Sequence, residues 1–306
     1  MTAALESDAE NVFGKPQQDE RNLAAFRERV LEQGRALYRD LPWRRTRDPY
    51  AIWISEVMLQ QTQVSRVDGR WQRWLDRFPT VDALAAADSA DVLEEWQGLG
   101  YNRRALALSR AARAVSASGG QMPVEEPALR ALPGIGAATA AGIRAFAYDL
   151  PGVYLETNVR TVFLHELYPA AEGVPDAELV PLVRKTCPKD ASNPQDDPRS
   201  WYYALLDYGA HLKATVPNPS RRSRSHARQS RFEGSHRQKR AELVRVLLAH
   251  RSEPAGGASF DVLLEELCNE ELAAGRNPLT ASEVADLLAE LSAEGFCYKA
   301  GNIWRV

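Results

Sequence analysis

The sequence predicts an all-α protein that ends in a small winged-helix-like module. Three observations support this fold class. Apolar residues recur at helical spacing through most of residues 21–216. Proline and glycine interrupt this periodicity at intervals typical of helix ends. No stretch before residue 290 has a convincing strand pattern, whereas residues 296–306 contain two short strand-like runs.

The helices of the main body are expected one after another with short connections. In the first helix, Leu23, Phe26 and Val30 fall on one apolar stripe, and Pro42 lies just beyond its end. Later boundaries coincide with single prolines or with closely spaced glycines. The expected helical ranges are 21–39, 50–63, 64–76, 80–96, 102–117, 125–131, 137–148, 158–168, 176–187 and 198–213.

The C-terminal residues are predicted to form a separate module. Helices are expected at 237–250, 259–272 and 280–293, followed by a hairpin that turns at Gly301-Asn302. Three helices and a terminal hairpin indicate a winged-helix-like fold. The sequence as a whole therefore predicts a disordered segment at 1–20, a helical domain at 21–216, a basic linker at 217–235 and the module at 236–306.

The composition excludes several classes of protein. No apolar run approaches the length of a membrane-spanning helix, and the acidic, polar N-terminus has no signal-peptide pattern. The cysteines Cys187, Cys268 and Cys297 are widely spaced, which predicts a reducing cytoplasm and neither a disulfide framework nor a zinc site. The net charge is −3, but Arg221 to Arg240 holds eight Lys or Arg and one acid. Such a run is either a solvated linker or a surface that contacts phosphates.

The segment Leu132-Pro133-Gly134-Ile135-Gly136 lies between two predicted helices. Its glycines allow a tight turn and a close approach of backbone N–H groups to another molecule. Those amides begin the helix at 137–148, where the helix dipole favours an anion such as a phosphate. The alternative is an ordinary helical corner whose glycines serve packing. The candidate contact residues are Leu132, Gly134, Ile135, Gly136 and Thr139.

Two acids are candidates for catalysis. Glu56 lies in an otherwise apolar helix, at the edge of the face formed by Ile54, Val57 and Met58. It is either a solvated residue or a partly buried acid whose pKa is raised by apolar neighbours, so that it donates a proton near neutral pH. Glu156 follows the Pro151-Gly152 break and opens the next helix. It is either a helix cap or the second, ionised carboxylate of a pair.

These segments together resemble the MutY family of adenine DNA glycosylases, within the helix–hairpin–helix superfamily that includes endonuclease III. The resemblance covers about residues 22–215. SEVMLQQTQV, which contains Glu56, is the most specific block, whereas LPGxG marks only the superfamily. The matching blocks are 41–64 (LPWRRTRDPYAIWISEVMLQQTQV), 96–101 (WQGLGY), 132–140 (LPGIGAATA) and 153–162 (VYLETNVRTV).

The resemblance implies a two-lobed helix–hairpin–helix DNA glycosylase fold and a role for each matching residue. Glu56 matches the general acid that protonates adenine N7, and Asn158 matches an amide that holds the catalytic carboxylate. Gln61 and Tyr101 match residues that wedge into the DNA around the base opposite the target. Ala138 stands where bifunctional relatives carry a nucleophilic lysine, which implies hydrolysis without strand cleavage.

The expected partner is double-stranded DNA with a mispaired or damaged base, bound by a monomer in the cytoplasm at the bacterial nucleoid. No membrane contact is predicted, and the sequence leaves protein partners open. The residues expected to contact DNA are Gln60, Gln61, Thr62, Tyr101, the five hairpin residues given above, and Arg221, Arg222 and Arg224.

The chain departs from the family in three respects. Glu156 stands where the family has Asp, and the added methylene moves the charge by about 1 Å, a displacement that can cost on the order of 100-fold in rate. Lys213, Ser220, Ser223 and Gln229 stand where the family has the four cysteines of a [4Fe–4S] cluster, so we expect no metal and no cofactor. The C-terminal module is shorter and more helical than the family's domain that reads 8-oxoguanine.

Three functions remain open on the sequence alone. The first is a monofunctional glycosylase that removes adenine opposite guanine or 8-oxoguanine. The second is the same chemistry on another base, such as thymine or uracil opposite guanine. The third is a non-catalytic DNA-binding protein, against which the intact block around Glu56 argues.

Overall fold

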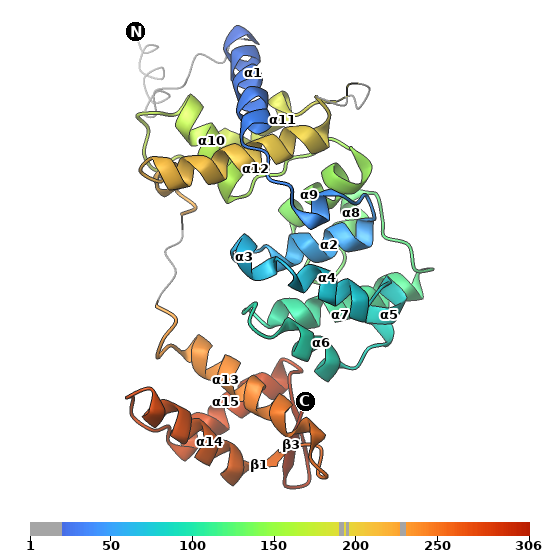
Figure 1. Cartoon of the computed structure of the whole chain (residues 1–306), viewed down its shortest axis with the longest axis vertical. Coiled ribbons are helices and arrows are strands. Elements are labelled where there is room, and N and C mark those ends of the chain that lie inside the picture. Colours follow the sequence, from blue (N-terminus) through green and yellow to red (C-terminus); the bar gives the residue numbers. More distant parts are fainter. Residues whose placement is uncertain (1–19, 190–192, 194–195, 227–230) are drawn as a thin grey trace, which may run out of the picture. The chain divides into compact units, whose positions relative to one another are not determined.

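The computed structural model describes residues 20–189, 193, 196–226 and 231–306 (Figure 1). The described chain divides into two compact units that each combine distant segments. The first contains the chain up to Glu56, Met122–Ala131 and the stretch from Ile135 to residue 228. The second contains Val57–Gln121, Leu132–Gly134 and the stretch from residue 229 to Val306. The predicted domain boundaries stay a prediction, and the predicted disordered segment lies outside the described residues except for Glu20.

The first unit is entirely helical within the described residues. Its core is formed by long helices that bury aromatic side chains, with Phe26 against Phe163 (ring centroids 5.0 Å apart) and against Trp201 (6.1 Å). Figure 1 shows α1 beside α12 and α10. The elements of this unit are α1 (Glu20–Ala36), η1 (Pro42–Arg44), α2 (Pro49–Met58), α8 (Glu126–Arg130), α9 (Ala137–Tyr148), α10 (Thr157–Leu167), α11 (Asp176–Thr186), α12 (Pro198–Thr215) and η2 (Pro219–Arg222).

A buried ion pair joins η1 to α12 in this core. The Arg44 guanidinium donates to both carboxylate oxygens of Asp207 at 2.7 and 2.8 Å, and Arg39 Nε donates to Asp207 Oδ1 at 2.5 Å. Asp207 is 2% exposed and Arg44 6%. The bidentate geometry satisfies the carboxylate where water has little access, so each partner depends on the other.

The second unit holds the remaining helices and the only sheet of the described residues. Trp74 packs edge-on against Trp96 (5.6 Å) and Phe78 (5.0 Å) in its core. The elements are α3 (Val64–Val67), α4 (Arg70–Arg77), α5 (Val81–Ala86), α6 (Ser89–Trp96), α7 (Arg103–Ala117), α13 (His236–Ala249), η3 (His250–Ser252), β1 (Ala258–Ser259), α14 (Phe260–Ala273), α15 (Ala281–Ala293), β2 (Tyr298–Ala300) and β3 (Ile303–Arg305).

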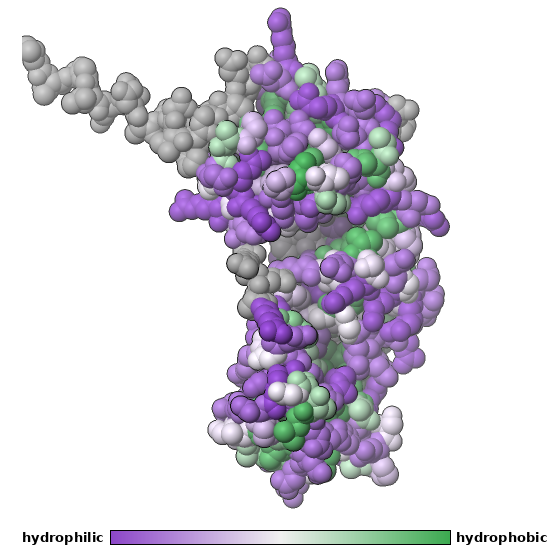
Figure 2. All heavy atoms as spheres, turned by 60° about the vertical axis from the view of Figure 1, so that its left-hand side comes forward, coloured by the Kyte–Doolittle hydropathy of each residue, from purple (hydrophilic) through white to green (hydrophobic). Residues whose placement is uncertain are grey.

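The predicted fold class is confirmed: the protein is mainly helical and ends in three helices with a small sheet. The expectation of no strand before residue 290 is wrong, because β1 pairs antiparallel with β3 and gives the sheet order β1-β3-β2. β1 has only two residues, too few to show an alternating pattern. On the face in Figure 2, hydrophilic side chains predominate and apolar ones gather in small groups. No helix of the described residues is long and apolar enough to cross a membrane.

Several predicted helices are shorter in the structure or divided. The range 50–63 ends at Met58, and 64–76 divides at Gly69, which has a φ of +75°. The range 80–96 divides into α5 and α6, each with its own N-cap, Thr80 and Asp88. These side chains accept hydrogen bonds from amides in the first turn, and each therefore begins a new helix. The spacing of apolar residues continues across both boundaries, so it does not reveal the division.

The buried pair predicts a large loss of stability in Asp207→Asn. The change leaves the Arg44 charge without its counter-ion in the core, which typically costs about 3–5 kcal/mol. The free energy of unfolding from urea titration measures the loss. Asp40→Asn, in an exposed pair with Arg45, is the matched control and should leave stability nearly unchanged. Equal effects of the two substitutions would contradict a structural role for the buried pair.

Candidate active site

Glu56 lies near the end of α2 among residues that are almost wholly buried. Ile54, Met58 and Val57 are at most 4% exposed, and the Ser55 hydroxyl donates to the Ile52 carbonyl inside the helix. Pro49 begins the helix, and the Asp48 side chain accepts from the Tyr50 amide. The apolar face predicted at Ile54, Val57 and Met58 is confirmed. It leaves the Glu56 carboxylate partly buried.

The carboxylate of Glu56 lies directly against the backbone of α9. A Cβ atom added at Gly142 would lie 2.3 Å from Glu56 Oε2 and 2.9 Å from Tyr154 Cε2. The missing side chain therefore makes the space that the carboxylate fills. The Tyr154 hydroxyl donates a hydrogen bond to Glu56. Tyr154 is itself fixed by edge contacts with Phe146 and Tyr202, each at 5.3 Å between ring centroids.

Burial makes Glu56 a weak acid. Removal from water raises the pKa of Glu56 from 4.5 to about 8, the Tyr154 hydrogen bond lowers it, and the negative charge of Glu156 raises it further. A carboxyl group with this pKa is protonated for most of the time at pH 7. Glu56 can therefore deliver a proton to a leaving group. This agrees with the second of the two interpretations from the sequence, that of a partly buried acid with a raised pKa.

Glu156 is the N-cap of α10. Its Oε1 accepts hydrogen bonds from the main-chain N–H groups of Asn158 (2.5 Å) and Val159 (2.9 Å). Burial holds the pKa of Glu156 above its ordinary value, and these two amides and the nearby charges of Lys213 and Arg160 offset only part of the rise. Glu156 thus caps α10 and also lies close enough to Glu56 for the two charges to interact. The two interpretations of Glu156 from the sequence, a helix cap and the second carboxylate of a pair, are therefore compatible.

Asn158 contacts this carboxylate through its backbone. Its side-chain Oδ1 instead accepts a hydrogen bond from Lys213 Nζ at 3.2 Å. The role that the resemblance assigns to the side-chain amide stays a prediction. Gly142 and Tyr154 were not among the residues predicted from the sequence. Tyr154 precedes Glu156 by two residues in the segment 153–162, and this spacing points both side chains to the same side of an extended segment.

The hairpin residues form the turn between α8 and α9. Gly134 has a φ of +78°, and a Cβ there would lie 2.7 Å from the Ala107 Cβ, so glycine is required. Gly136 is the N-cap of α9 and offers no side chain to its first amides. Ile135 and Thr139 are buried, at 5% and 7% exposure. The turn therefore presents main-chain N–H groups, rather than side chains, at the start of α9.

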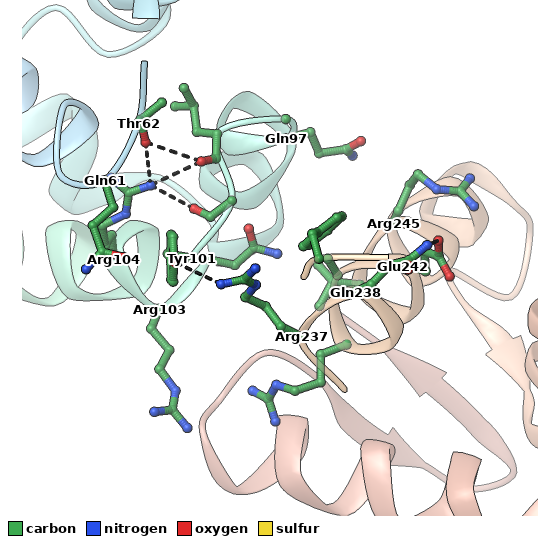
Figure 3. Close-up of a pocket in the computed structure, with 18 of the residues that line it drawn as sticks. Gln61, Thr62, Gln97, Tyr101, Arg103, Arg104, Arg237, Gln238, Glu242 and Arg245 are labelled. Carbon is green, nitrogen blue, oxygen red and sulfur yellow. Dashed lines mark hydrogen bonds between the residues drawn. The ribbon is translucent and has the colours of Figure 1, made fainter. Parts of the chain in front are cut away.

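The polar cluster after α2 and the loop before α7 are built around one arginine. Arg104 donates to the carbonyls of Val57 and Gln60, each at 2.7 Å. It also donates to the Gly100 carbonyl at 2.9 Å and to Thr62 Oγ1 at 3.1 Å (Figure 3). Gln61 and Tyr101 both have left-handed backbones, with φ of +53° and +50°. Such conformations are uncommon for residues other than glycine and cluster at functional sites.

These loops form one wall of a pocket of about 1070 Å³, and α13 forms another. Arg237 Nη1 donates to the Tyr101 hydroxyl at 2.9 Å, and its guanidinium lies 5.3 Å from the ring centroid (Figure 3). Arg103 bonds both oxygens of Glu294 at 2.5 and 2.6 Å, which ties the C-terminal module to α7. Most of the charged side chains that line the pocket are arginines.

The three predicted phosphate contacts of the basic segment differ in their surroundings. The Arg222 guanidinium donates to the carbonyls of Leu164, Tyr168 and Pro169. It therefore holds its own loop against the end of α10. Arg221 and Arg224 are exposed. The three DNA contacts stay a prediction.

The residues at the family's cluster positions do not fit a metal. Lys213 offers an ammonium group, and Ser220 and Ser223 are buried hydroxyls at 3% and 5% exposure. Ser220 N–H and O–H both donate to Asn218 Oδ1, at 3.1 and 2.8 Å. Gln229 lies outside the described residues. Among the described residues no three His, Cys, Asp or Glu side chains gather as metal ligands would. No step of the chemistry is therefore assigned to a cluster.

Comparison with known proteins identifies the class. Residues 54–186 match the HhH-GPD superfamily, described as base excision DNA repair proteins. A thermostable thymine-DNA glycosylase shares the fold, with a TM-score of 0.56, 23% identity, and coverage of 65% of this chain and 91% of that chain. The chain belongs to this superfamily, which makes DNA its macromolecular partner.

Within the superfamily, two relatives are adenine DNA glycosylases. That of Mycolicibacterium smegmatis is 34% identical over 282 residues, which is 86% of this chain and 92% of the relative. The human protein is 39% identical over 154 residues, or 47% of this chain and 28% of that protein. The chain is thus a member of the MutY-like adenine DNA glycosylase family, and the resemblance read from the sequence is confirmed.

The raised pKa of Glu56 predicts a pH-dependent stability. The folded protein holds a proton that the unfolded chain releases above its ordinary pKa, so stability falls as pH rises from about 4.5 to about 8. Glu56→Gln cannot ionise. Its stability relative to the parent protein should therefore grow between pH 5 and pH 8, by on the order of a few kcal/mol. Urea denaturation across this range measures the difference.

Glu172→Gln, which removes an exposed carboxylate, is the control for the loss of one acidic group. A stability difference for Glu56→Gln that stays constant with pH would show that Glu56 is not held protonated.

Proposed function

We propose that the chain hydrolyses the N-glycosidic bond of adenine paired with guanine or 8-oxoguanine in duplex DNA, without cutting the strand. The observation that carries this proposal is the pair of carboxyl groups in unlike surroundings. Glu56 is buried against Gly142 and favours its protonated form, while Glu156 receives two main-chain amides and two nearby cations. The family relationship supplies adenine as the base.

The two carboxyl groups divide the work of the reaction. Glu56 donates its proton to adenine, at N7 by the family resemblance, and the bond between C1′ and N9 breaks with its electron pair going to the base. Positive charge develops on the sugar, and the Glu156 carboxylate stabilises it. Water then adds to C1′ and gives its proton to the carboxylate that Glu56 has become. The products are free adenine and an abasic site.

Hydrolysis without strand cleavage is supported by Ala138. This residue lies in the first turn of α9, where the resemblance places the nucleophilic lysine of bifunctional relatives. Alanine has no amine and cannot form a Schiff base with the sugar. The abasic product should therefore remain in an intact strand until alkali cleaves it.

The DNA contacts extend this proposal. The amides at the start of α9 bind a backbone phosphate, and Gln61 and Tyr101 enter the duplex opposite the extruded adenine. Gln60, Thr62, Arg221, Arg222 and Arg224 flank these groups as further contacts. We assign a monomer, acting in the cytoplasm at the nucleoid, as the working form. The left-handed backbones of Gln61 and Tyr101 support the wedge, since they direct two neighbouring loops to one pocket.

Glu56→Gln should abolish base release, because the amide has no acidic proton to give. The measurement is single-turnover release from end-labelled duplexes with A:8-oxoguanine, A:G, T:G or U:G, each read with and without alkali. We expect alkali-dependent cleavage of the adenine strand by the parent protein and a loss of at least about 100-fold in the variant. DNA affinity should stay close to that of the parent.

Other outcomes favour the remaining functions. Release of thymine or uracil alone would assign the same chemistry to another base, and Glu156 in place of aspartate would then be part of that specificity. Tight binding with no release from any duplex would indicate a binding protein. Unchanged release by Glu56→Gln would remove Glu56 from the mechanism.

Arg237→Ala should weaken DNA binding through its effect on Tyr101. The substitution removes a hydrogen bond and a stacked cation from the wedge residue, and we expect about a tenfold loss of affinity for an A:8-oxoguanine duplex. Fluorescence anisotropy in the Glu56→Gln background measures it. Lys239→Ala is the matched control, because Lys239 lies on the same helix, pairs with Glu283 and does not line the pocket. Equal affinities of the two variants would contradict a role for α13 at the wedge.

A further inference from the structure

Lys213 lies at the last turn of α12, next to the start of α10. Its Nζ donates to Asn158 Oδ1 at 3.2 Å, and the Asn158 N–H in turn donates to Glu156 Oε1 at 2.5 Å. A chain of two hydrogen bonds therefore leads from the lysine, through one residue, to the carboxylate. The side chain of Lys213 is otherwise exposed.

The closeness of α12 to this turn is built into the fold. A Cβ at Gly209 would lie 2.2 Å from the Asn158 carbonyl oxygen and 2.8 Å from its Cβ. Gly209 thus allows α12 to touch the backbone of the residue that carries the amide. Lys213 follows Gly209 by four residues and so lies above it on the same face of the helix. The helix that makes the close approach also supplies the cation.

Of the two cations near the Glu156 carboxylate, Arg160 and Lys213, only Arg160 forms an ion pair with another acid among the described residues. Four titratable or charged groups face the Glu156 carboxylate: Glu56, Tyr154, Arg160 and Lys213. The Arg160 guanidinium binds both oxygens of Asp176 at 2.8 Å, which offsets its charge. No carboxylate of the described residues lies within ion-pair distance of Lys213 Nζ.

We propose that Lys213 is a positioning residue for glycosidic bond hydrolysis: its ammonium group holds the Asn158 turn, and with it the Glu156 carboxylate, in place beside the sugar. This proposal rests on the function proposed above. It assigns a role to the position at which the family has its first cluster cysteine. In this chain that position faces the reacting carboxylate and not a metal.

The direction of the effect follows from the charges. The Lys213 cation lowers the pKa of Glu156, opposing the burial that raises it. Removing the cation raises the pKa of Glu156 further, and a protonated carboxyl stabilises a sugar cation poorly. The loss of rate should therefore grow as the pH falls. DNA affinity should not change if Lys213 acts only through Asn158.

The test compares Lys213→Met, Lys213→Arg and Lys185→Met. Single-turnover release of adenine from an A:8-oxoguanine duplex is followed from pH 5.5 to pH 9. We expect the acid limb of the Lys213→Met profile to move to higher pH, with about a tenfold loss of rate below the limb for each pH unit of displacement. Lys213→Arg keeps the charge and should retain most of the rate. Lys185→Met removes an exposed lysine from the last turn of α11 and should match the parent.

Two further readouts separate a positioning role from others. Thermal unfolding of Lys213→Met should match that of the parent because the side chain is exposed, so a rate loss is not a folding defect. DNA affinity in the Glu56→Gln background should be unchanged. Weaker binding with a smaller salt dependence, and an unmoved pH profile, would make Lys213 a phosphate contact and overturn the proposal.

The failure of this inference is distinguishable from failure of the proposed function. If the parent protein releases adenine and Lys213→Met has the same rate and pH profile as Lys185→Met, Lys213 has no role at the site. If the parent protein releases no adenine from any duplex, the proposed function is wrong and the assignment of Lys213 falls with it.

Discussion

The active-site geometry depends on one close contact, that of the Glu56 carboxyl group with the bare backbone of Gly142. A buried acid without a counter-ion is costly, and the structure makes that cost small by keeping the acid protonated and giving it the Tyr154 hydroxyl. A side chain at position 142 would displace the carboxyl group. Burial raises the pKa of Glu56, and the core that packs Tyr154 against Phe146 and Tyr202 places the hydroxyl that opposes part of this rise.

The longer acid at position 156 is compatible with catalysis because the helix start controls its carboxylate. An aspartate N-cap reaches the second and third amides of a helix with one methylene, and Glu156 reaches the same pair, those of Asn158 and Val159, with two. The carboxylate is therefore placed by the amides as well as by the length of the side chain. The dipole of α10 adds a stabilising field for the anion. Glu56 receives neither contribution, so the two acids differ in their surroundings.

The sequence predicted what short motifs determine and missed what tertiary packing determines. The helical body, the glycine turn before α9 and the apolar face around Glu56 follow from local periodicity, and the structure confirms them. The early end of α2 does not follow from it, because Arg104, far along the chain, draws the carbonyls after Met58 into its own hydrogen bonds. Tyr154 and Lys213 are placed at the site by residues distant in the sequence, Glu56 for Tyr154 and Asn158 for Lys213. No spacing within a single segment encodes such a pairing.

The loop after α12 lacks the cysteines that hold a cluster in the family, and hydrogen bonds within the protein fix its conformation instead. In a loop that binds an iron–sulfur cluster, cysteine thiolates coordinate the iron atoms, so the fold must keep these side chains available as ligands. Here the corresponding hydroxyls form hydrogen bonds within the protein: Asn218 Oδ1 accepts from the Ser220 hydroxyl, and the Ser223 hydroxyl accepts from the Ser225 main-chain N–H. Arg222 completes the loop by donating to the carbonyls at the end of α10. Hydrogen bonds thus connect the loop to α10 and to Val174 just before α11. Lys213, at the first cysteine position of the family's cluster, instead places a charge next to Asn158.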